Sequence, residues 1–204
     1  MDLIHKLSNH ISEKIENELN HDNDQREVIK YGVFVSMQIL YSILVSIIIG
    51  LVCGTLKEIL IISFTASILR RYSGGVHATS LNRCVVIGNF IFGVMALGVK
   101  YIYLSNHISL YLIGGIFLYG YYVIFKYVPV DTESKRIKND IKRKKLRNKS
   151  LVLLSIYLII TMLFIKDNVS MAIAMGIFYQ IFTLTKLGNV TLSKLDNILS
   201  NIIN

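Results

Sequence analysis

Six long apolar runs divide this chain, and they restrict its fold more than any other feature of the sequence. The runs cover residues 33–53, 58–69, 85–104, 108–128, 151–165 and 171–187. A helix needs about 20 mainly apolar residues to cross the hydrocarbon core of a bilayer, and several of the runs approach or reach that length. Because lipid offers no hydrogen-bond partners to an open backbone, such segments are expected to be helical. The pattern predicts an all-α polytopic membrane protein with about six transmembrane helices in one domain over residues 1–204.

The composition agrees with a membrane protein. Hydrophobic residues make up 53% and charged residues 17% of the 204-residue chain, whereas soluble domains are typically about 45–50% apolar and about 25% charged. The two cysteines, Cys53 and Cys84, form no Cys-x-x-Cys pair, and no His-Glu-x-x-His motif occurs. A zinc site is therefore not expected, and no cofactor is indicated.

The first 30 residues form a polar, amphipathic segment ahead of the apolar runs. Apolar side chains recur every three or four positions from Leu3 to Leu19, which predicts an amphipathic helix. Two roles are open for it: a helix lying in the membrane interface, or a helix packed on the protein's own loops. The first apolar run begins only at Val33, so no secretory signal is expected.

The distribution of basic residues predicts an orientation in the membrane. The formal net charge is +9, and the basic residues flank the apolar runs, as in loops on the cytoplasmic side of a membrane protein. With six spans and a cytoplasmic N-terminus, only Lys57, Lys100 and Lys166 of the 22 basic residues fall outside. Both termini, the polar segment 70–84 and the basic loop 131–149 are then cytoplasmic in the cell membrane. This count depends on the short run 58–69 crossing the bilayer.

The basic loop 131–149 holds nine lysines and arginines. Such a loop most often anchors the topology and binds anionic lipid, and the functional alternative is capture of an acidic peptide. Because its charges adjoin apolar runs, we expect lipid contacts and no nucleic acid partner.

The polar segment 70–84, Arg-Arg-Tyr-Ser-Gly-Gly-Val-His-Ala-Thr-Ser-Leu-Asn-Arg-Cys, carries the residues best suited to catalysis. Cys84 is a candidate nucleophile and His77 a candidate base, because a thiolate attacks whereas a thiol hardly does. Seven residues of continuous helix would separate them by about 10 Å, so a dyad requires the segment to fold back. Asn89, Ser73 and Ser80 are alternative partners for orienting the imidazole. The structural alternative is a packed cysteine and a solvated histidine.

Three features of the sequence resemble one family. They are the segment 70–78, the position of Cys84 seven residues after His77, and the segment 128–133, Val-Pro-Val-Asp-Thr-Glu, followed by a basic loop. Together they resemble the accessory gene regulator B (AgrB) family of membrane cysteine endopeptidases in Gram-positive quorum sensing. The resemblance implies that His77 and Cys84 are catalytic, that an AgrD-like precursor peptide is the substrate, and that the protein is a homodimer.

The resemblance also implies a reaction and a set of substrate contacts. Cys84 would form a thioester with the N-terminal part of the precursor, and a side chain within that peptide would then close a thiolactone or lactone ring. Precursors of this kind have an amphipathic leader and an acidic tail, which basic residues attract. The candidate contacts are Arg70, Arg71, Gly75, Lys135, Arg136, Lys142, Arg143, Lys144 and Lys145.

The rival class is a non-catalytic membrane transporter or scaffold for peptide export. A transport path is normally marked by polar or charged residues at midspan. Gln38 and Asn89, which lie inside the apolar runs, are thin support for such a path. The peptidase is therefore favoured over the transporter.

Overall fold

A computed structural model describes residues 10, 23–75, 79–130, 139–165 and 167–200. The chain falls into two compact units, Met1–Val45 and Ser46–Asn204. All regular elements in the described residues are helices, so the predicted all-α class is confirmed. The expected N-terminal amphipathic helix lies outside the described residues, apart from His10.

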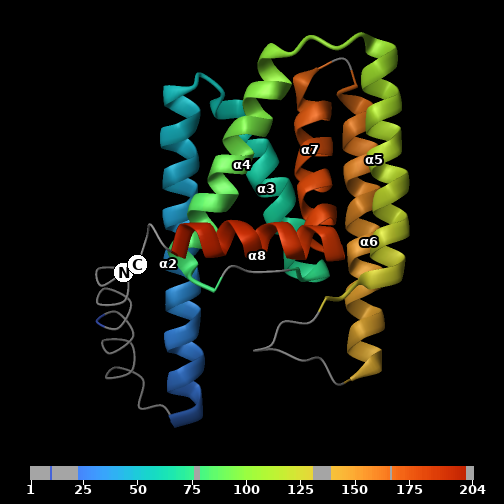
Figure 1. Ribbon diagram of the computed structural model, residues 1–204. Coiled ribbons are helices and arrows are strands. Elements are labelled where there is room, and N and C mark those ends of the chain that lie inside the picture. Colours follow the sequence, from blue (N-terminus) through green and yellow to red (C-terminus); the bar gives the residue numbers. More distant parts are fainter. Residues whose placement is uncertain (1–9, 11–22, 76–78, 131–138, 166, 201–204) are drawn as a thin grey trace. The chain divides into compact units, whose positions relative to one another are not determined.

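Seven helices are described, and Figure 1 labels each of them. They are α2 (Asn23–Val52), α3 (Leu56–Ser73), α4 (Leu81–Tyr101), α5 (Asn106–Tyr127), α6 (Asp140–Leu163), α7 (Asn168–Thr183) and α8 (Lys186–Ser200). The first unit consists, in its described part, mainly of α2 up to Val45. The helices of the second unit coincide with the apolar runs, except that α6 begins much earlier and α8 was expected only as a weakly amphipathic tail.

Among the described residues, three helices are long and apolar enough to cross a membrane: Asn82–Tyr101 of α4, α5 and α6. The α7 helix becomes a fourth if it is counted with α8, from which it is bent by 87°. The α3 helix carries four charged residues in 18, and the apolar part of α2, Ser36–Val52, is shorter than a typical span. The protein is therefore a helical membrane protein with three to four candidate spans, and six remains a prediction.

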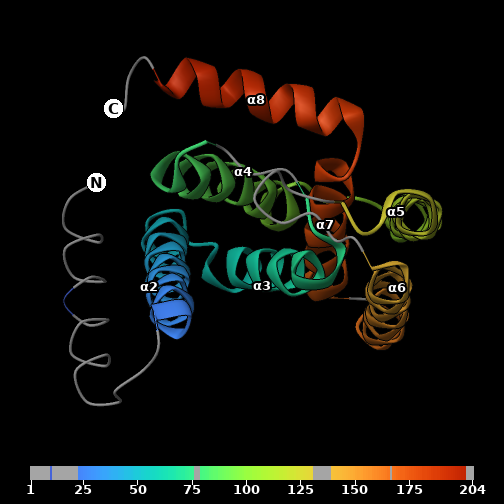
Figure 2. The same ribbon diagram turned by 90° about the horizontal axis from the view of Figure 1, so that it is seen from below.

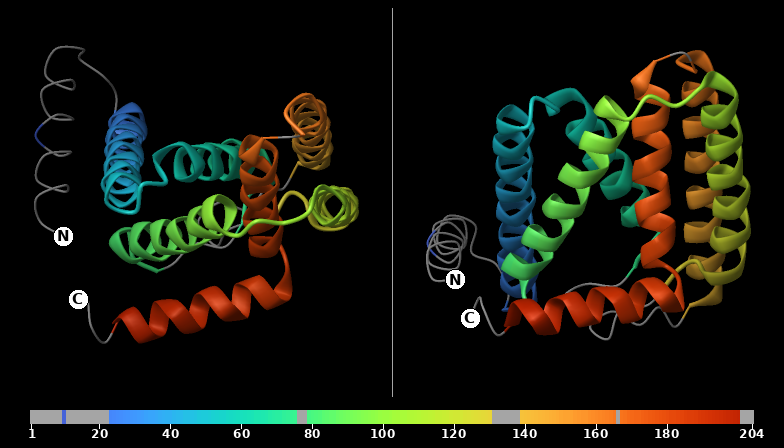
Figure 3. Two further views of the ribbon diagram at one scale, coloured as in Figure 1. Left: turned by 90° about the horizontal axis from the view of Figure 1, so that it is seen from above. Right: turned by 45° about the horizontal axis from the view of Figure 1, so that its top comes forward.

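The α7 helix lies at the centre of the second unit and packs against α3, α4, α5, α6 and α8. Figures 2 and 3 show it between the α3–α4 side and the α5–α6 side. A helix that is apolar on nearly all sides belongs in such an interior, and most of α7 is buried. A Cβ atom added at Gly176 would lie only 2.7 Å from the Ile62 carbonyl oxygen, so this glycine allows the close approach of α3 and α7.

The chain turns sharply between α7 and α8, inside the run that predicted one span over residues 171–187. The Gly188 N–H donates to Thr185 Oγ1 at 3.1 Å, so Thr185 caps the new helix. The α8 helix then lies across one end of the other helices of this unit (Figure 1). The amphipathic tail predicted from Val190 onward therefore belongs to a defined helix that begins at Lys186.

Residues 140–149, expected as part of a basic loop, form the first turns of α6. Asn139 Oδ1 accepts hydrogen bonds from the Ile141 and Lys142 N–H groups, which stabilises the start of the helix. Lysine, arginine and leucine are also good helix formers. The remaining part of that loop, residues 131–138, lies outside the described residues.

Candidate functional site

The ends of α3, α5 and α7 and the starts of α4 and α6 lie at the same end of the second unit as α8 (Figures 1 and 3). The sequence motif falls at this end, because α3 finishes at Ser73 and α4 begins at Leu81. Most of the candidate residues named from the sequence therefore lie at one end of the helices, and the contacts between them define the site.

Gly74 joins the two segments that carry the sequence motif. It forms an isolated parallel bridge with Val130, whose N–H donates to the Ser73 carbonyl at 3.0 Å. Gly74 has φ +73°, and a Cβ atom at this position would overlap the Val130 carbonyl oxygen. Only glycine satisfies both conditions at low cost. The motif residues around 74 and 130 are thus neighbours in space as well as parts of one pattern.

Gln180 of α7 binds the same segment from inside the protein. Its fully buried side chain donates from Nε2 to Ser73 Oγ at 2.9 Å and to the Gly74 carbonyl at 2.7 Å. Its Oε1 has no hydrogen-bond partner among the described residues. Sequence reasoning missed Gln180, although an amide within the apolar run 171–187 was a visible signal.

Gly75 and Arg70, two of the proposed substrate contacts, lie together against α7. A Cβ atom at Gly75 would lie 2.9 Å from Thr183 Oγ1 and 3.7 Å from Arg70 Cζ. Gly75 is buried, whereas Arg71, the residue after Arg70, is exposed. Gly75 therefore allows the close packing of this segment against α7, and Arg71 remains accessible at the surface.

Cys84 lies half-buried in the first turn of α4, where its N–H donates to the Ser80 carbonyl at 3.0 Å. Tyr179 of α7 is close enough to interact electrostatically with both Cys84 and Arg70. Gly88 lies one turn after Cys84 on the same face of α4. A Cβ atom added at Gly88 would lie 3.9 Å from the Tyr179 hydroxyl oxygen. The thiol is thus carried on a rigid helix, near α7 and the end of α3.

His77 lies outside the described residues, so its role remains a prediction. Of its three suggested partners, Asn89 is buried and bonds to Ser46 Oγ and to the Val85 carbonyl. Ser73 Oγ donates to the Leu69 carbonyl at 3.0 Å and accepts from Gln180. Asn89 and Ser73 therefore have structural partners within the helices, and Ser80 is the N-cap residue of α4.

Asp196 of α8 binds both sides of the turn that leads to Cys84. Its Oδ2 accepts from the Thr79 N–H at 2.8 Å and from Thr79 Oγ1 at 2.7 Å, and its Oδ1 accepts from Arg83 Nε at 2.7 Å. Burial raises the pKa of the Asp196 carboxyl, but the hydrogen bonds from Thr79 and the Arg83 charge outweigh it, so its pKa lies below the usual range. Sequence reasoning missed this residue, whose one signal was an acid on the buried face of the tail, one turn after Leu192.

Some basic residues of α6 contact the motif segments, and others are exposed without such a contact being described. Lys142, Lys144 and Lys145 are exposed. Arg143 is half-buried and donates to the Pro129 carbonyl at 3.1 Å, and Lys149 Nζ lies 5.6 Å from the centre of the Tyr72 ring. The start of α6 is thereby attached to both motif segments. Lys135 and Arg136 lie outside the described residues.

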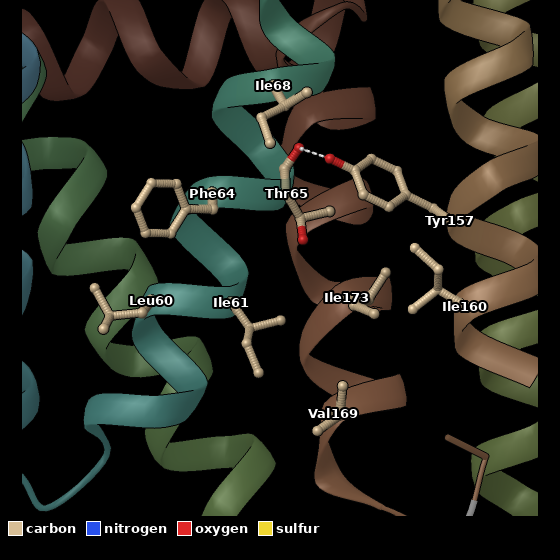
Figure 4. Close-up of a pocket in the computed structure, with 9 residues that line it drawn as sticks. All are labelled: Leu60, Ile61, Phe64, Thr65, Ile68, Tyr157, Ile160, Val169 and Ile173. Atoms are coloured by element: carbon tan, nitrogen blue, oxygen red, sulfur yellow. Dashed lines mark hydrogen bonds between the residues drawn. The ribbon is translucent and has the colours of Figure 1, made fainter. Parts of the chain in front are cut away.

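An apolar hollow of about 300 Å³ opens between α3, α6 and α7 (Figure 4). Its polar members are Thr65 and Tyr157, and the Tyr157 hydroxyl donates to the Thr65 carbonyl at 3.5 Å. Its lining contains no cysteine, histidine or charged side chain. The hollow is therefore separate from the site around Cys84 and has no group suited to peptide chemistry.

Comparison with known proteins gives consistent matches. The AgrB family, described as accessory gene regulator B, matches residues 8–184. An AgrB-like protein of Clostridium perfringens strain SM101 is 38% identical over 98% of this chain and 100% of its own length. Accessory gene regulator protein B of Staphylococcus aureus strain MRSA252 is 31% identical over 61% of this chain and 64% of its own. No solved structure matches the chain.

The family match includes residues 70–84, the 128–133 segment and the basic part of α6, and the identity to the Clostridium protein extends over nearly the whole chain. This chain therefore belongs to the accessory gene regulator B family, a membrane-associated family of the agr quorum-sensing system that is known for processing the AgrD peptide.

Proposed function

We propose that this protein is a membrane cysteine endopeptidase that cleaves an AgrD-like precursor at the cytoplasmic surface of the cell membrane. The observation that carries the proposal is the position of Cys84. It lies half-buried in the first turn of α4, at the helix ends where the Arg70–Gly75 segment meets α7. A thiol held on a rigid helix beside polar loops suits a nucleophile that must meet an extended peptide.

In the proposed reaction, His77 removes the proton from Cys84 as Sγ attacks the carbonyl carbon of the scissile peptide bond. The tetrahedral intermediate collapses, the C–N bond breaks, and His77 returns the proton to the leaving amine. The C-terminal part of the precursor departs, and its N-terminal part stays as a thioester on Cys84. No metal or cofactor takes part in these steps.

A side chain within the bound peptide then completes the reaction. Its thiol or hydroxyl attacks the thioester carbonyl, His77 accepts its proton, and Cys84 leaves as the thiolate. The product is a thiolactone or lactone ring. Water must be kept away from the thioester, because hydrolysis would otherwise compete. The packing of Gly75 against α7 and the hydrogen bond from Gln180 of α7 to Gly74 favour a closed inner wall.

The exposed lysines of α6 are the proposed contacts for the acidic tail of the precursor. Lys142, Lys144 and Lys145 have free access to solvent, and α6 is attached to the motif segment through Arg143 and Pro129. An acidic peptide or an anionic lipid headgroup is attracted to such a cluster. The homodimer implied by the family resemblance is part of this proposal.

The export alternative has less support than the peptidase. Asn89 and Gln180 are the amides in the apolar runs of the second unit, and both bond to groups within the protein. Polar residues that line a transport path would instead be directed toward a water-filled space.

The proposal is tested by mass spectrometry of the full-length protein in liposomes with the precursor encoded beside it. We expect a covalent adduct of the N-terminal part of the precursor on the wild type. The adduct should be absent from Cys84→Ala and strongly reduced in His77→Ala, whereas Cys53→Ala should retain it. A cleaved precursor with unchanged yield in Cys84→Ala would contradict the proposal.

A further inference from the structure

Asp196 lies at the end of the helices where Cys84 also lies. Among the described residues, it is the carboxylate that bonds to the motif segment. Only 3% of the residue is exposed. Both of its oxygens are used, Oδ2 for the backbone and side chain of Thr79 and Oδ1 for Arg83. A buried carboxylate is costly unless its lone pairs are satisfied, and here three donors, one of them charged, satisfy them.

The partners of Asp196 stand on either side of the proposed dyad in the sequence. Thr79 follows His77 by two residues, and Arg83 immediately precedes Cys84. Arg83 Nη2 also donates to Thr79 Oγ1 at 2.6 Å, so Asp196, Thr79 and Arg83 form a closed ring of hydrogen bonds. The ring ties the exit of the loop to the first turn of α4, which the folding back of residues 77–84 requires.

Asp196 reaches this place because of the corner between α7 and α8. The cap at Thr185 starts α8 in its own direction. Leu192 and Asp196, one turn apart, are buried residues of α8, which packs against α4. Asp196 lies beyond residues 8–184, which the family match covers. Its role therefore has to be argued from these contacts alone.

We propose that Asp196 is a positioning residue of the peptidase, which fixes residues 79–84 through Thr79 and Arg83 so that the thiol of Cys84 is held where the proposed base can reach it. This inference rests on the proposed function, because it requires the dyad. Among the described residues, Asp196 bonds to Thr79 and Arg83 and makes no hydrogen bond to Cys84. It acts through Thr79 and Arg83, so α8 contributes to the site through Asp196.

The test measures the rate at which iodoacetamide alkylates Cys84 in the full-length protein, as a function of pH between about 5 and 9. The measurement uses the Cys53→Ala background, so that Cys84 is the remaining thiol. No precursor is needed. If His77 governs the thiol, His77→Ala should change the shape of the pH profile.

Asp196→Asn keeps the size of the side chain and removes the charge, and we expect it to shift the profile toward that of His77→Ala. At pH 7 the rate should fall by about tenfold or more, since small displacements of paired groups cost that much or more in reactivity. Asp196→Glu should restore part of the rate. Thr79→Val changes an exposed residue. It removes the hydroxyl contacts with Asp196 and Arg83 and keeps the backbone N–H contact, so it should give an intermediate profile even if Asp196→Asn folds poorly.

The matched control is Asn197→Ala, which changes the next residue on the exposed side of α8. Its profile should superimpose on that of the parent. If Asp196→Asn and Thr79→Val also superimpose on the parent while His77→Ala does not, the positioning role is wrong and the dyad stands. If His77→Ala itself leaves the profile unchanged, the dyad of the proposed function is wrong, and the positioning role is overturned with it.

Discussion

At the level of single residues, Gly74 shows how backbone conformation and packing impose one amino acid. Its φ of +73° lies in a region that side-chain-bearing residues rarely adopt, and Val130 occupies the space that a Cβ would need. The bridge to Val130 and the hydrogen bond from Gln180 both depend on this conformation. Gly74, the C-cap residue of α3, is therefore also a junction of three segments.

We expect Gly74→Ala to destabilise the protein by about 1–3 kcal/mol, because the added methyl group strains φ and displaces Val130. Thermal unfolding of the purified protein in detergent measures the change, and cleavage of the precursor should fall as well. Gly114→Ala in α5 is the control, since nothing lies within 4 Å of an added Cβ there. Equal melting temperatures for the two variants would contradict this account of Gly74.

At the level of secondary structure, α8 is held to the start of α4 through one carboxylate. The pKa of Asp196 is lowered in the folded protein relative to its ordinary value of 3.8, because the hydrogen bonds from Thr79 and the charge of Arg83 outweigh burial. A lowered pKa means that the ionised carboxylate stabilises the folded state above the unfolded-state pKa. That stabilisation is lost as the pH falls through the still lower folded-state pKa, while Arg83 remains charged.

Asp196→Asn should therefore destabilise the protein by a constant amount at neutral pH, and by progressively less as the pH falls below about 4. Melting temperatures of the wild type and the variant across this range measure the difference. Hydrogen exchange in α8 should increase in parallel as the contact is lost. A difference between the two proteins that persists unchanged into acid would show that the charge of Asp196 contributes nothing to stability.

At the level of the whole molecule, the basic residues at the start of α6 lie at the end of the second unit that also carries the proposed site. The engaged residues Arg143 and Lys149 attach α6 to Pro129 and Tyr72. The exposed lysines 142, 144 and 145 are left to interact with anions from outside. Such exposed charges attract a substrate over distances of about a Debye length, roughly 10 Å at 0.1 M salt.

Stepwise replacement of Lys142, Lys144 and Lys145 by glutamine should raise the KM for an acidic-tailed precursor several-fold at low salt and leave kcat nearly unchanged. The difference from the wild type should shrink as salt is added. Steady-state cleavage in liposomes of neutral lipid measures both constants. Lys57→Gln, at the exposed start of α3, is the control, and an equal effect of this change would argue against a specific basic cluster.

The sequence alone determined the all-helical class, the membrane character and the positions of most helices in the second unit, because hydropathy is a property of short segments. The fourth apolar run ends at Val128, directly before Pro129, and α5 ends at Tyr127. The motif also placed Cys84 at the start of a helix, where it lies. The number of spans was harder to predict, since charged residues in α3 and the corner after α7 interrupt the apolar pattern.

Only the tertiary structure decided which residues surround the motif. Gln180 and Ser73 are 107 positions apart, and Asp196 and Thr79 are 117 apart. Hydropathy indicates that a residue is buried, but it carries no information about the partner that satisfies its hydrogen bonds. Such long-range pairing forms only when the helices pack. It accounts for the central place of α7, the bridge between Gly74 and Val130, and the attachment of α8 to α4.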